Sequence, residues 1–253
     1  MDTSPAVIVE ARDRKLFITL NRPHALNAQN DEMRDLLVAA IDRLETDPDL
    51  LVGIVHGVGG RAFSAGADLN EVGSGGPGRP VPQHRRPSWR HFEAFRWATK
   101  PIIAAIDGWC LGGGLELANY CDIRIATGSS RFGQPEPRTV GGTAGPALHQ
   151  LPRVIPLGEA LLMQLTSQPM SAQRAYEIGL VQRLCADADA LLAEADAIAD
   201  QMIECNPTAL RRIKRVVRWG ADMAVEQAEM LALMGEESAA QAHADTGWER
   251  PTR

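Results

Sequence analysis

The hydrophobic and polar positions near the start of the chain alternate in two short runs. Apolar residues fall on either side of the polar residues 12–14, at Val7 and Val9 and then at Leu16, Ile18 and Leu20. Alternation with a period of two is typical of β-strands. Residues 6–20 are therefore predicted to form a β-hairpin.

The pattern then changes to a helical period. Apolar residues spaced three and four apart occur at Met33, Leu36, Leu37, Ala40, Ile41 and Leu44. They form one face of an amphipathic helix, which Asp47–Pro48 ends. Short apolar runs at Leu51–Val55, Ile102–Ile106 and Asp122–Ala126 predict buried strands with helices between or after them. We therefore expect an α/β layered core, and its β-β-α rhythm is compatible with a wound superhelix.

In the rest of the chain, Gly, Pro and helix-capping residues indicate where loops lie and where helices begin and end. Gly73–Arg90 is rich in Gly and Pro and is predicted to be a mobile loop. Ser171 is the predicted N-cap of a helix that ends at Gly179, before a final strand at Leu180–Leu184. Residues 187–245 hold three helical stretches without a strand, broken near Asn206–Pro207 and Gly220. The predicted division is a core at residues 1–185 and a C-terminal helical region at residues 186–253.

Composition narrows the possible functions. The 253 residues are 45% hydrophobic and 23% charged, with no run near the ~18 apolar residues of a membrane span. The N-terminus has no secretory pattern, so a cytoplasmic protein without membrane partners is expected. The net charge of −6 argues against nucleic acid as the main partner. Scattered histidines predict no metal site, and four separated cysteines predict reduced core thiols: Cys110, Cys121, Cys185 and Cys205.

Three consecutive glycines, Gly112–Gly114, stand between a buried strand and an apolar helix. A helix N-terminus has free N–H groups and a positive dipole end, so an amide near Gly113 suits a developing oxyanion. Glu116 lies on the same helical face. Its apolar neighbours imply burial, which would be costly for a carboxylate without a role. A purely structural glycine turn is the alternative for this segment alone.

Two further segments carry candidate chemistry. RAFSAGADL, residues 61–69, is a small-residue turn after a strand, and its Ala65–Gly66 amides could supply a second oxyanion donor. In RFGQPEPR, residues 131–138, Glu136 stands between two prolines in a rigid, non-helical context. It is a candidate general acid or base, and an ordinary turn residue is the alternative. Ser64 lacks a GxSxG elbow, and no nucleotide-binding glycine motif is present.

Taken together, these segments closely resemble the crotonase superfamily, also called the enoyl-CoA hydratase/isomerase family. The resemblance runs through NRPHALNA, AFSAGADLNEV, KPIIAAIDG, GGGLELANYCDIRIA, FGQPE and SAQRAYEIGLV. It implies the α/β crotonase fold, with a ββα superhelical core and a C-terminal helical trimerisation region. It also implies a homotrimer or a dimer of trimers.

The same resemblance implies the site and the reaction. Glu116 and Glu136 would be the catalytic pair, and Ala65 and Gly113 would donate the two oxyanion-hole amides. Contacts with the CoA ester would come from Arg22, His24, Ala25, Ala62, Gly66, Ala67, Asp68, Leu69 and Gly112. Both acids together favour a lyase of fatty acid metabolism that hydrates a 2-enoyl-CoA to 3-hydroxyacyl-CoA. In it Glu116 acts on water and Glu136 on the Cα proton, with no cofactor beyond the substrate's own CoA.

The chain departs from the family pattern in two places. After FGQPE the glycines are displaced, and LPRVIP resembles the carnitinyl-CoA dehydratase branch. The ending, residues 235–253, lacks the usual aromatic and Glu-Lys-Arg residues. The alternatives are therefore an isomerase, a carnitinyl-CoA dehydratase-like enzyme, a decarboxylase, a thioester hydrolase, or a non-catalytic CoA-ester or RNA-binding relative. A basic run is predicted to be a solvated face or, alternatively, a contact for an anionic acyl tail or the CoA phosphates: Arg79, Arg85, Arg86, Arg90 and Arg96.

Overall fold

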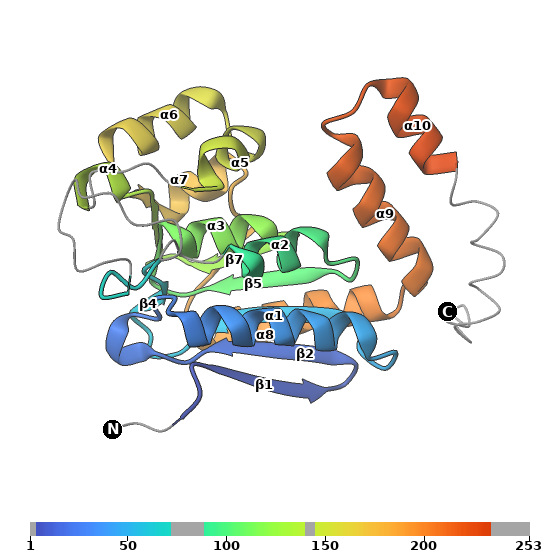
Figure 1. Cartoon of the computed structure of the whole chain (residues 1–253), viewed down its shortest axis with the longest axis horizontal. Helices are drawn as coiled ribbons and strands as arrows, with labels where there is room; N and C mark the ends of the chain where they lie inside the picture. Colours follow the sequence, from blue (N-terminus) through green and yellow to red (C-terminus); the bar gives the residue numbers. More distant parts are fainter. Residues whose placement is uncertain (1–3, 72–88, 140–144, 234–253) are drawn as a thin grey trace.

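The computed structural model describes residues 4–71, 89–139 and 145–233. Strand, strand and helix follow one another repeatedly along the chain, and the units stack into layers (Figure 1). The elements are β1 (Val7–Arg12), β2 (Lys15–Leu20), the 3₁₀ helix η1 (Pro23–Ala25), α1 (Asp31–Thr46), β3 (Val52–Gly57), β4 (Ala62–Ser64), α2 (Arg90–Trp97), β5 (Ile102–Ile106), β6 (Trp109–Leu111), α3 (Gly113–Tyr120), β7 (Ile123–Thr127), β8 (Arg131–Gly133), α4 (Glu136–Thr139), α5 (Ala147–Val154), α6 (Leu157–Thr166), β9 (Met170–Ser171), α7 (Ala172–Glu177), β10 (Arg183–Cys185), α8 (Ala188–Ile203), α9 (Pro207–Gly220) and α10 (Val225–Leu233).

The strands form two sheets: β1 and β2 both join the larger sheet, whereas the next three units each place their first strand in the larger sheet and their second strand in the smaller one. The six-stranded sheet has the order β1-β2-β3-β5-β7-β10 and is parallel apart from the β1–β2 hairpin. The other sheet has the order β4-β6-β8-β9, with β4, β6 and β8 parallel. Three parallel neighbours end at one edge of this sheet, so the loops after β4, β6 and β8 are brought together there.

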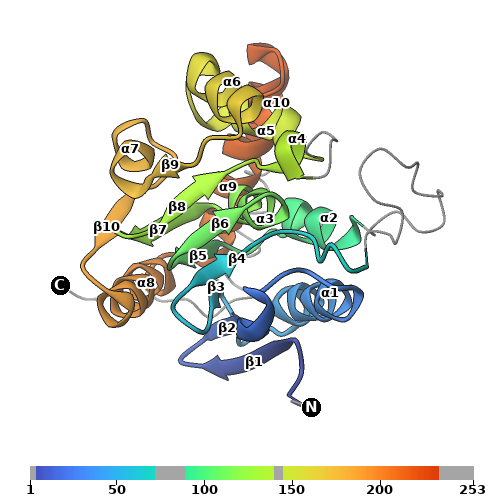
Figure 2. The same ribbon diagram turned by 90° about the vertical axis from the view of Figure 1, so that its left-hand side faces the viewer.

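The central strands of the six-stranded sheet are buried on both faces, whereas the edge strand β1 is largely exposed. Alternate strand residues such as Val55 and Ala104 face the main core beneath α1 and α3. Their neighbours Ile54 and Ile103 face α8, whose Ala195 packs against them. This two-sided burial explains the unbroken apolar run of β5. The helices on the two faces are separated clearly in Figure 2.

Most predicted elements are confirmed. The hairpin turns at Asp13 and Arg14, which both adopt positive φ, as tight hairpin turns require. Ser171 caps α7 by accepting a hydrogen bond from Arg174 N, and Gly179 follows the helix with φ +83°. The predicted strand at Leu180–Leu184 is wrong in its start, because the Val181 amide bonds to Ala175 O and closes α7 instead of joining a sheet.

Two other expectations need correction or lie outside the structure. Cys205 follows the end of α8 and is exposed, and Cys185 is the last residue of the edge strand β10 and is only partly buried, so only Cys110 and Cys121 are core thiols. All four are free. The predicted loop at 73–90 falls outside the described residues except for its last two positions. The same holds for Arg79, Arg85 and Arg86 and for the atypical ending at 235–253.

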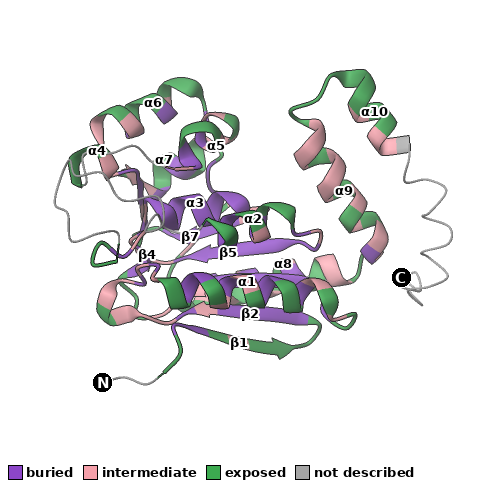
Figure 3. Cartoon of the chain, viewed as in Figure 1, coloured by how far each residue is buried: buried purple, intermediate pink, exposed green. Residues whose placement is uncertain are grey.

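The C-terminal helices divide into two kinds. α8 packs on the sheet, whereas α9 and α10 stand beside the sheet core (Figure 1) and bury few side chains (Figure 3). The C-terminal region predicted to begin at residue 186 therefore combines α8, which packs on the sheet, with α9 and α10, which do not. α9 is held by Asp122, which accepts from Lys214 Nζ at 2.8 Å and from Arg218 Nε at 2.9 Å.

Candidate active site

The loops after β4, β6 and β8 surround a cavity of about 400 Å³. It brings together Glu116 and Glu136, which are separated along the chain but were predicted to act as a pair. The cavity is lined by Gln29, Arg34, Ala65, Gly66, Ala67, Leu69, Trp89, His91, Phe92, Leu111, Gly112, Gly113, Glu116, Pro135, Glu136, Thr139 and Gly145.

The glycines of the turn before α3 allow close approach from two sides. Gly112 has φ +50°, and a Cβ there would lie 2.5 Å from Glu136 Oε1. A Cβ on Gly114 would lie 2.3 Å from Ser64 O, at the end of β4. Both contacts are far too short for any side chain. The glycines therefore seat the N-terminus of α3 against β4 and leave room for the Glu136 carboxyl group.

Glu116 is buried on the first turn of α3, with 4% of its surface exposed. Burial raises its pKa to about 7, and the negative charge of Glu136 pushes in the same direction. The Ala147 amide opposes this by donating a hydrogen bond of 2.9 Å to Glu116 Oε1. A carboxyl group with a pKa near neutrality can both take and give a proton at physiological pH.

Glu136 lies at the start of a helix, which corrects the predicted non-helical context. Arg138 N and Thr139 N both donate to Pro135 O, at 2.9 and 3.0 Å, and close the single turn of α4. Pro137 is tolerated because a residue in the first helical turn needs no N–H donor. Burial raises the pKa of Glu136 as well. Two carboxyl groups with raised pKa values thus share one cavity.

Of the two backbone amides that the sequence suggested as oxyanion donors, Gly113 is free to act and Ala65 is not. The Ala65 amide donates to Leu26 O at 3.0 Å, so the structure argues against Ala65 as an oxyanion donor. The Gly113 amide begins α3, and neither it nor the Ala67 amide has a hydrogen-bond acceptor in the described part of the chain. A Cβ on Gly113 would lie 3.5 Å from Ala67 N, so these two N–H groups are neighbours.

The predicted substrate-binding residues fall into two groups. Gly66, Ala67, Leu69 and Gly112 line the cavity. The others do not line it, and their contacts with CoA stay predictions: Arg22, His24, Ala25, Ala62 and Asp68.

Arg22 and Asp68 have a structural partnership that the sequence did not reveal. They form an ion pair of 2.8 Å, and Arg22 also donates to Ala28 O. Burial would raise the pKa of Asp68, but hydrogen bonds from Arg22 and Asn70 outweigh it and lower that pKa. The ion pair joins the loop before α1 to the loop after β4, which carries Ala67.

Gln29 is a site residue that the sequence reading missed. Its Nε2 donates to Gly113 O at 3.1 Å, and its Oε1 is 3.2 Å from Nε2 of the buried His91. The side chain therefore fixes the first turn of α3 from the opposite side of the cavity. Gln29 directly follows NRPHALNA, a segment that carries the family resemblance, and this position could have indicated a residue of the site.

The wall beside Glu116 comes partly from the start of α2 and the residue before it. Trp89, His91 and Phe92 line the cavity. A Cβ on Gly145 would lie 3.1 Å from the Trp89 ring and 3.4 Å from Glu116 Oε1. Gly145, in the atypical stretch after Glu136, thus lies between the Trp89 ring and the carboxyl group of Glu116.

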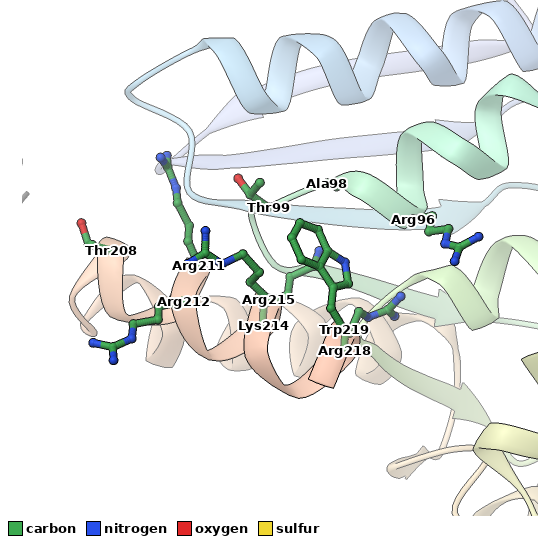
Figure 4. A pocket seen from close by; sticks show the side chains of 10 residues that line it. All are labelled: Arg96, Ala98, Thr99, Thr208, Arg211, Arg212, Lys214, Arg215, Arg218 and Trp219. Atoms are coloured by element: carbon green, nitrogen blue, oxygen red, sulfur yellow. The ribbon is translucent and has the colours of Figure 1, made fainter. Parts of the chain in front are cut away.

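A second hollow, of about 270 Å³, lies between α9 and the segment after α2 (Figure 4). None of the residues that line it lines the cavity with the glutamates. Six of them are cationic, namely Arg96, Arg211, Arg212, Lys214, Arg215 and Arg218. Arg96 from the predicted basic run therefore faces this groove, away from the glutamates.

The described ranges 4–71, 89–139 and 145–233 contain no group of three metal-ligating side chains. No helix within them has the length and apolar character needed to cross a bilayer.

Comparison with known proteins gives a consistent result. The sequence model of a family described as enoyl-CoA hydratase/isomerase matches residues 13–250. A short-chain-enoyl-CoA hydratase of Clostridium acetobutylicum is 34% identical, over 88% of this chain and 84% of that protein. A 2,3-dehydroadipyl-CoA hydratase of Escherichia coli is 35% identical, over 87% and 84%. The crystal structure of an enoyl-CoA hydratase from Mycobacterium marinum superimposes with a TM-score of 0.79 at 34% identity, covering 99% of this chain and 98% of that one.

Proposed function

The chain belongs to the enoyl-CoA hydratase/isomerase family, and we propose that it adds water reversibly across the double bond of a 2-enoyl-CoA. The product is a 3-hydroxyacyl-CoA. The observation that carries this proposal is a single cavity lined by Glu116 and Glu136, together with the amides of Gly113 and Ala67, which have no acceptor in the described part of the chain. The match to the family model and to the related hydratases confirms the predicted membership of the crotonase superfamily, whereas the likeness to carnitinyl-CoA dehydratases stays a prediction.

The amides of Gly113 and Ala67 are proposed to hold the thioester oxygen. When water adds at Cβ, negative charge moves through Cα onto this oxygen. Two N–H groups fixed by the fold stabilise that charge more than they stabilise the neutral carbonyl. The position of Gly113 at the N-terminus of α3 adds the positive end of the helix dipole.

Glu116 and Glu136 divide the proton transfers. Glu116, as a carboxylate, takes a proton from water while the oxygen bonds to Cβ. Glu136, in its acid form, gives a proton to Cα. Dehydration reverses both transfers, so each group needs access to both protonation states, and raised pKa values supply this. The CoA that the reaction uses is part of the substrate, and we propose no other cofactor.

The assembly is proposed to be a homotrimer or a dimer of trimers. Ile213 and Val217 on α9 are 58% and 66% exposed, which supports a partner surface on this helix. Light scattering at micromolar concentration tests this proposal, and a monomeric mass would contradict it. A cytoplasmic location stays the expectation from the sequence.

Incubation with 2-enoyl-CoAs of differing length and polarity, followed by mass spectrometry, tests the proposed reaction. Hydration adds the mass of one water to the thioester and gives a 3-hydroxyacyl product. A product of unchanged mass would indicate isomerisation instead, and release of free CoA would indicate thioester hydrolysis. The same panel reports which acyl chains fit beside Trp89 and Leu69.

A further inference from the structure

A third hollow, of about 720 Å³, lies between α9 and the helices α2, α3 and α5 (Figure 1), and we call it the α5–α9 cleft. None of its lining residues lines the cavity with the glutamates. Phe92 and Glu116 line that cavity, whereas Arg96 and Tyr120, each four residues further along α2 and α3, line the cleft. Four residues of an α-helix advance by about 6 Å, so the cleft lies roughly one helical turn beyond Glu116.

Aromatic side chains connect the two hollows and line the cleft. The rings of Phe92 and Tyr120 are both buried, and their centroids are 5.9 Å apart, so a residue of the cavity touches a residue of the cleft. Trp219 of α9 adds apolar surface to the cleft, and its ring meets the edge of Trp97 at a centroid distance of 5.4 Å. The apolar part of a ligand therefore has surfaces to contact here.

Asn119 is a buried side chain of the cleft whose amide lacks hydrogen-bond partners. Only 5% of its surface is exposed, yet neither Nδ2 nor Oδ1 has a partner in the part of the chain that the structure describes. Within the same residues, Gln150 Oε1 on α5 lacks a partner as well. A buried polar group without a partner is costly, so these groups point to a bound molecule that completes them. Nδ2 offers such a molecule a hydrogen-bond donor.

The cleft also carries an excess of positive charge, with four arginines against two aspartates. Both aspartates are already paired, because Asp222 accepts from Arg153 at 2.8 Å and Asp122 holds α9. Arg96 forms no ion pair with a residue of 4–71, 89–139 or 145–233. Desolvation lowers the pKa of His149 at the cleft, and the charges of Arg153 and Arg96 lower it further. The unbalanced charge selects an anionic ligand.

We propose that the α5–α9 cleft binds a carboxylate group carried on an apolar chain. Arg96 supplies the positive charge, Asn119 Nδ2 donates a hydrogen bond, and the rings of Tyr120 and Trp219 contact the chain. An inorganic anion would leave these rings uncovered. Two molecules present this chemistry: the end of the substrate's own acyl chain, which would pass Phe92, and a free carboxylic acid. The first source rests on the proposed function, and the second does not.

The first experiment measures kcat/KM for 2-enoyl-CoAs of equal chain length that end in a methyl group or in a carboxylate. If the acyl chain is the source, the wild type prefers the carboxylate-ended substrate once the chain spans a helical turn. Arg96→Met keeps the aliphatic part of an exposed side chain and removes its charge, so it should fold and lower this preference about tenfold to a hundredfold. Arg43→Met, at an exposed position on α1 outside all three hollows, should leave the preference unchanged.

The second experiment requires no turnover. Isothermal titration calorimetry compares hexanoate with 1-hexanol, which has an apolar chain of the same length and no charge. Hexanoate should bind the wild type and Arg43→Met about tenfold or more tightly than 1-hexanol does, and Arg96→Met should remove this difference. Arg96-dependent binding of hexanoate without a preference among the substrates would support the proposal with a free carboxylic acid as the ligand.

If neither substrate preference nor hexanoate binding depends on Arg96, water alone completes Asn119 and the inference is wrong. The two proposals can fail separately. Absence of hydration by the wild type, together with Arg96-dependent binding of hexanoate, would contradict the proposed reaction and leave the carboxylate site intact. Hydration without any dependence on Arg96 would do the reverse.

Discussion

The backbone nitrogen of Ala147 donates a hydrogen bond of 2.9 Å to Glu116 Oε1, across 31 residues of sequence. Ala147 begins α5 and belongs to the stretch in which the chain departs from the pattern of its family. The Ala147 amide of the atypical stretch therefore contacts the carboxyl group that is proposed to act on water. Its effect is expected first on the orientation and pKa of Glu116, and through them on the attack of water.

Replacing each glutamate by glutamine should separate the two proton transfers. Glu136→Gln should abolish both hydration and exchange of the Cα proton with solvent deuterium. Glu116→Gln should abolish hydration but keep part of this exchange, because Glu136 still reaches Cα. Losses of ~10²–10⁴ in turnover are expected for each acid. Proton NMR of saturated acyl-CoA in deuterated buffer measures the exchange. Wild-type hydration by either variant would remove these assignments.

The oxyanion donor can be tested by deleting one N–H group. Gly113→Ala is unsuitable, because its Cβ would lie 3.0 Å from Gln29 Oε1. Replacing Gly113 by glycolic acid changes its amide N–H to an ester oxygen and adds no bulk. We expect turnover to fall ~10²–10³-fold. The same exchange at Gly158, in the first turn of α6 and outside the cavity, is the control. Equal activity of the two esters would exclude the Gly113 amide as a principal donor.

Stability should depend on pH through Glu116. Its pKa is about 7 in the folded protein against 4.5 for the free side chain, so between these values the folded protein holds a proton that the unfolded chain has lost. The free energy of unfolding therefore falls as pH rises from 4.5 to 7, by about 3 kcal/mol from this group. Glu116→Gln removes the dependence.

Urea unfolding at pH 5 and pH 8 measures this effect. Glu116→Gln should gain stability over the wild type at pH 8 and lose most of that advantage at pH 5. Glu10→Gln, at an exposed position on β1, controls for removing one negative charge. A difference between Glu116→Gln and wild type that is equal at both pH values would show that Glu116 ionises without cost in the folded protein.

The attachment of α9 should depend on Asp122. Asp122→Asn leaves Lys214, with 8% of its side chain exposed, without its carboxylate, and a buried charge that loses its partner costs roughly 3 kcal/mol or more. Hydrogen exchange should accelerate in α9 and less in β5. Asp222→Asn breaks an ion pair whose side chains are more than half exposed, so it should change neither. Unchanged protection of α9 in Asp122→Asn would contradict this role.

Local patterns predicted the elements well where one face of the element packs on the core. The helix α1 follows the spacing of its apolar residues, and β5 has the predicted limits Ile102–Ile106 because both of its faces are buried. Motif spacing also placed Glu116 and Glu136 in one site. These features depend on which side chains are apolar and which are acidic, and this can be read directly from the sequence.

The choice between Ala65 and Ala67 could not be made from the sequence. It depends on whether a carbonyl from another segment occupies the amide, and Leu26 O lies 39 positions before Ala65 in the chain. The role of Gln29 likewise depends on tertiary contacts, since its partners are the backbone oxygen of Gly113 and the ring of His91 on other elements. The short helix at Glu136 was missed because two prolines suggest an extended chain.

The catalytic surface of this chain is made as much from main-chain atoms as from side chains. A saturation mutagenesis screen would find all three of Gly112, Gly113 and Gly114 sensitive, since Gly112 and Gly114 are crowded by Glu136 and Ser64 and Gly113 less severely by Gln29. It could not reveal that Gly113 alone of the three is proposed to supply its N–H to substrate. At such a site, the effect of a side-chain substitution reports how much space is available. The role of the N–H group is tested only by replacing the peptide bond with an ester.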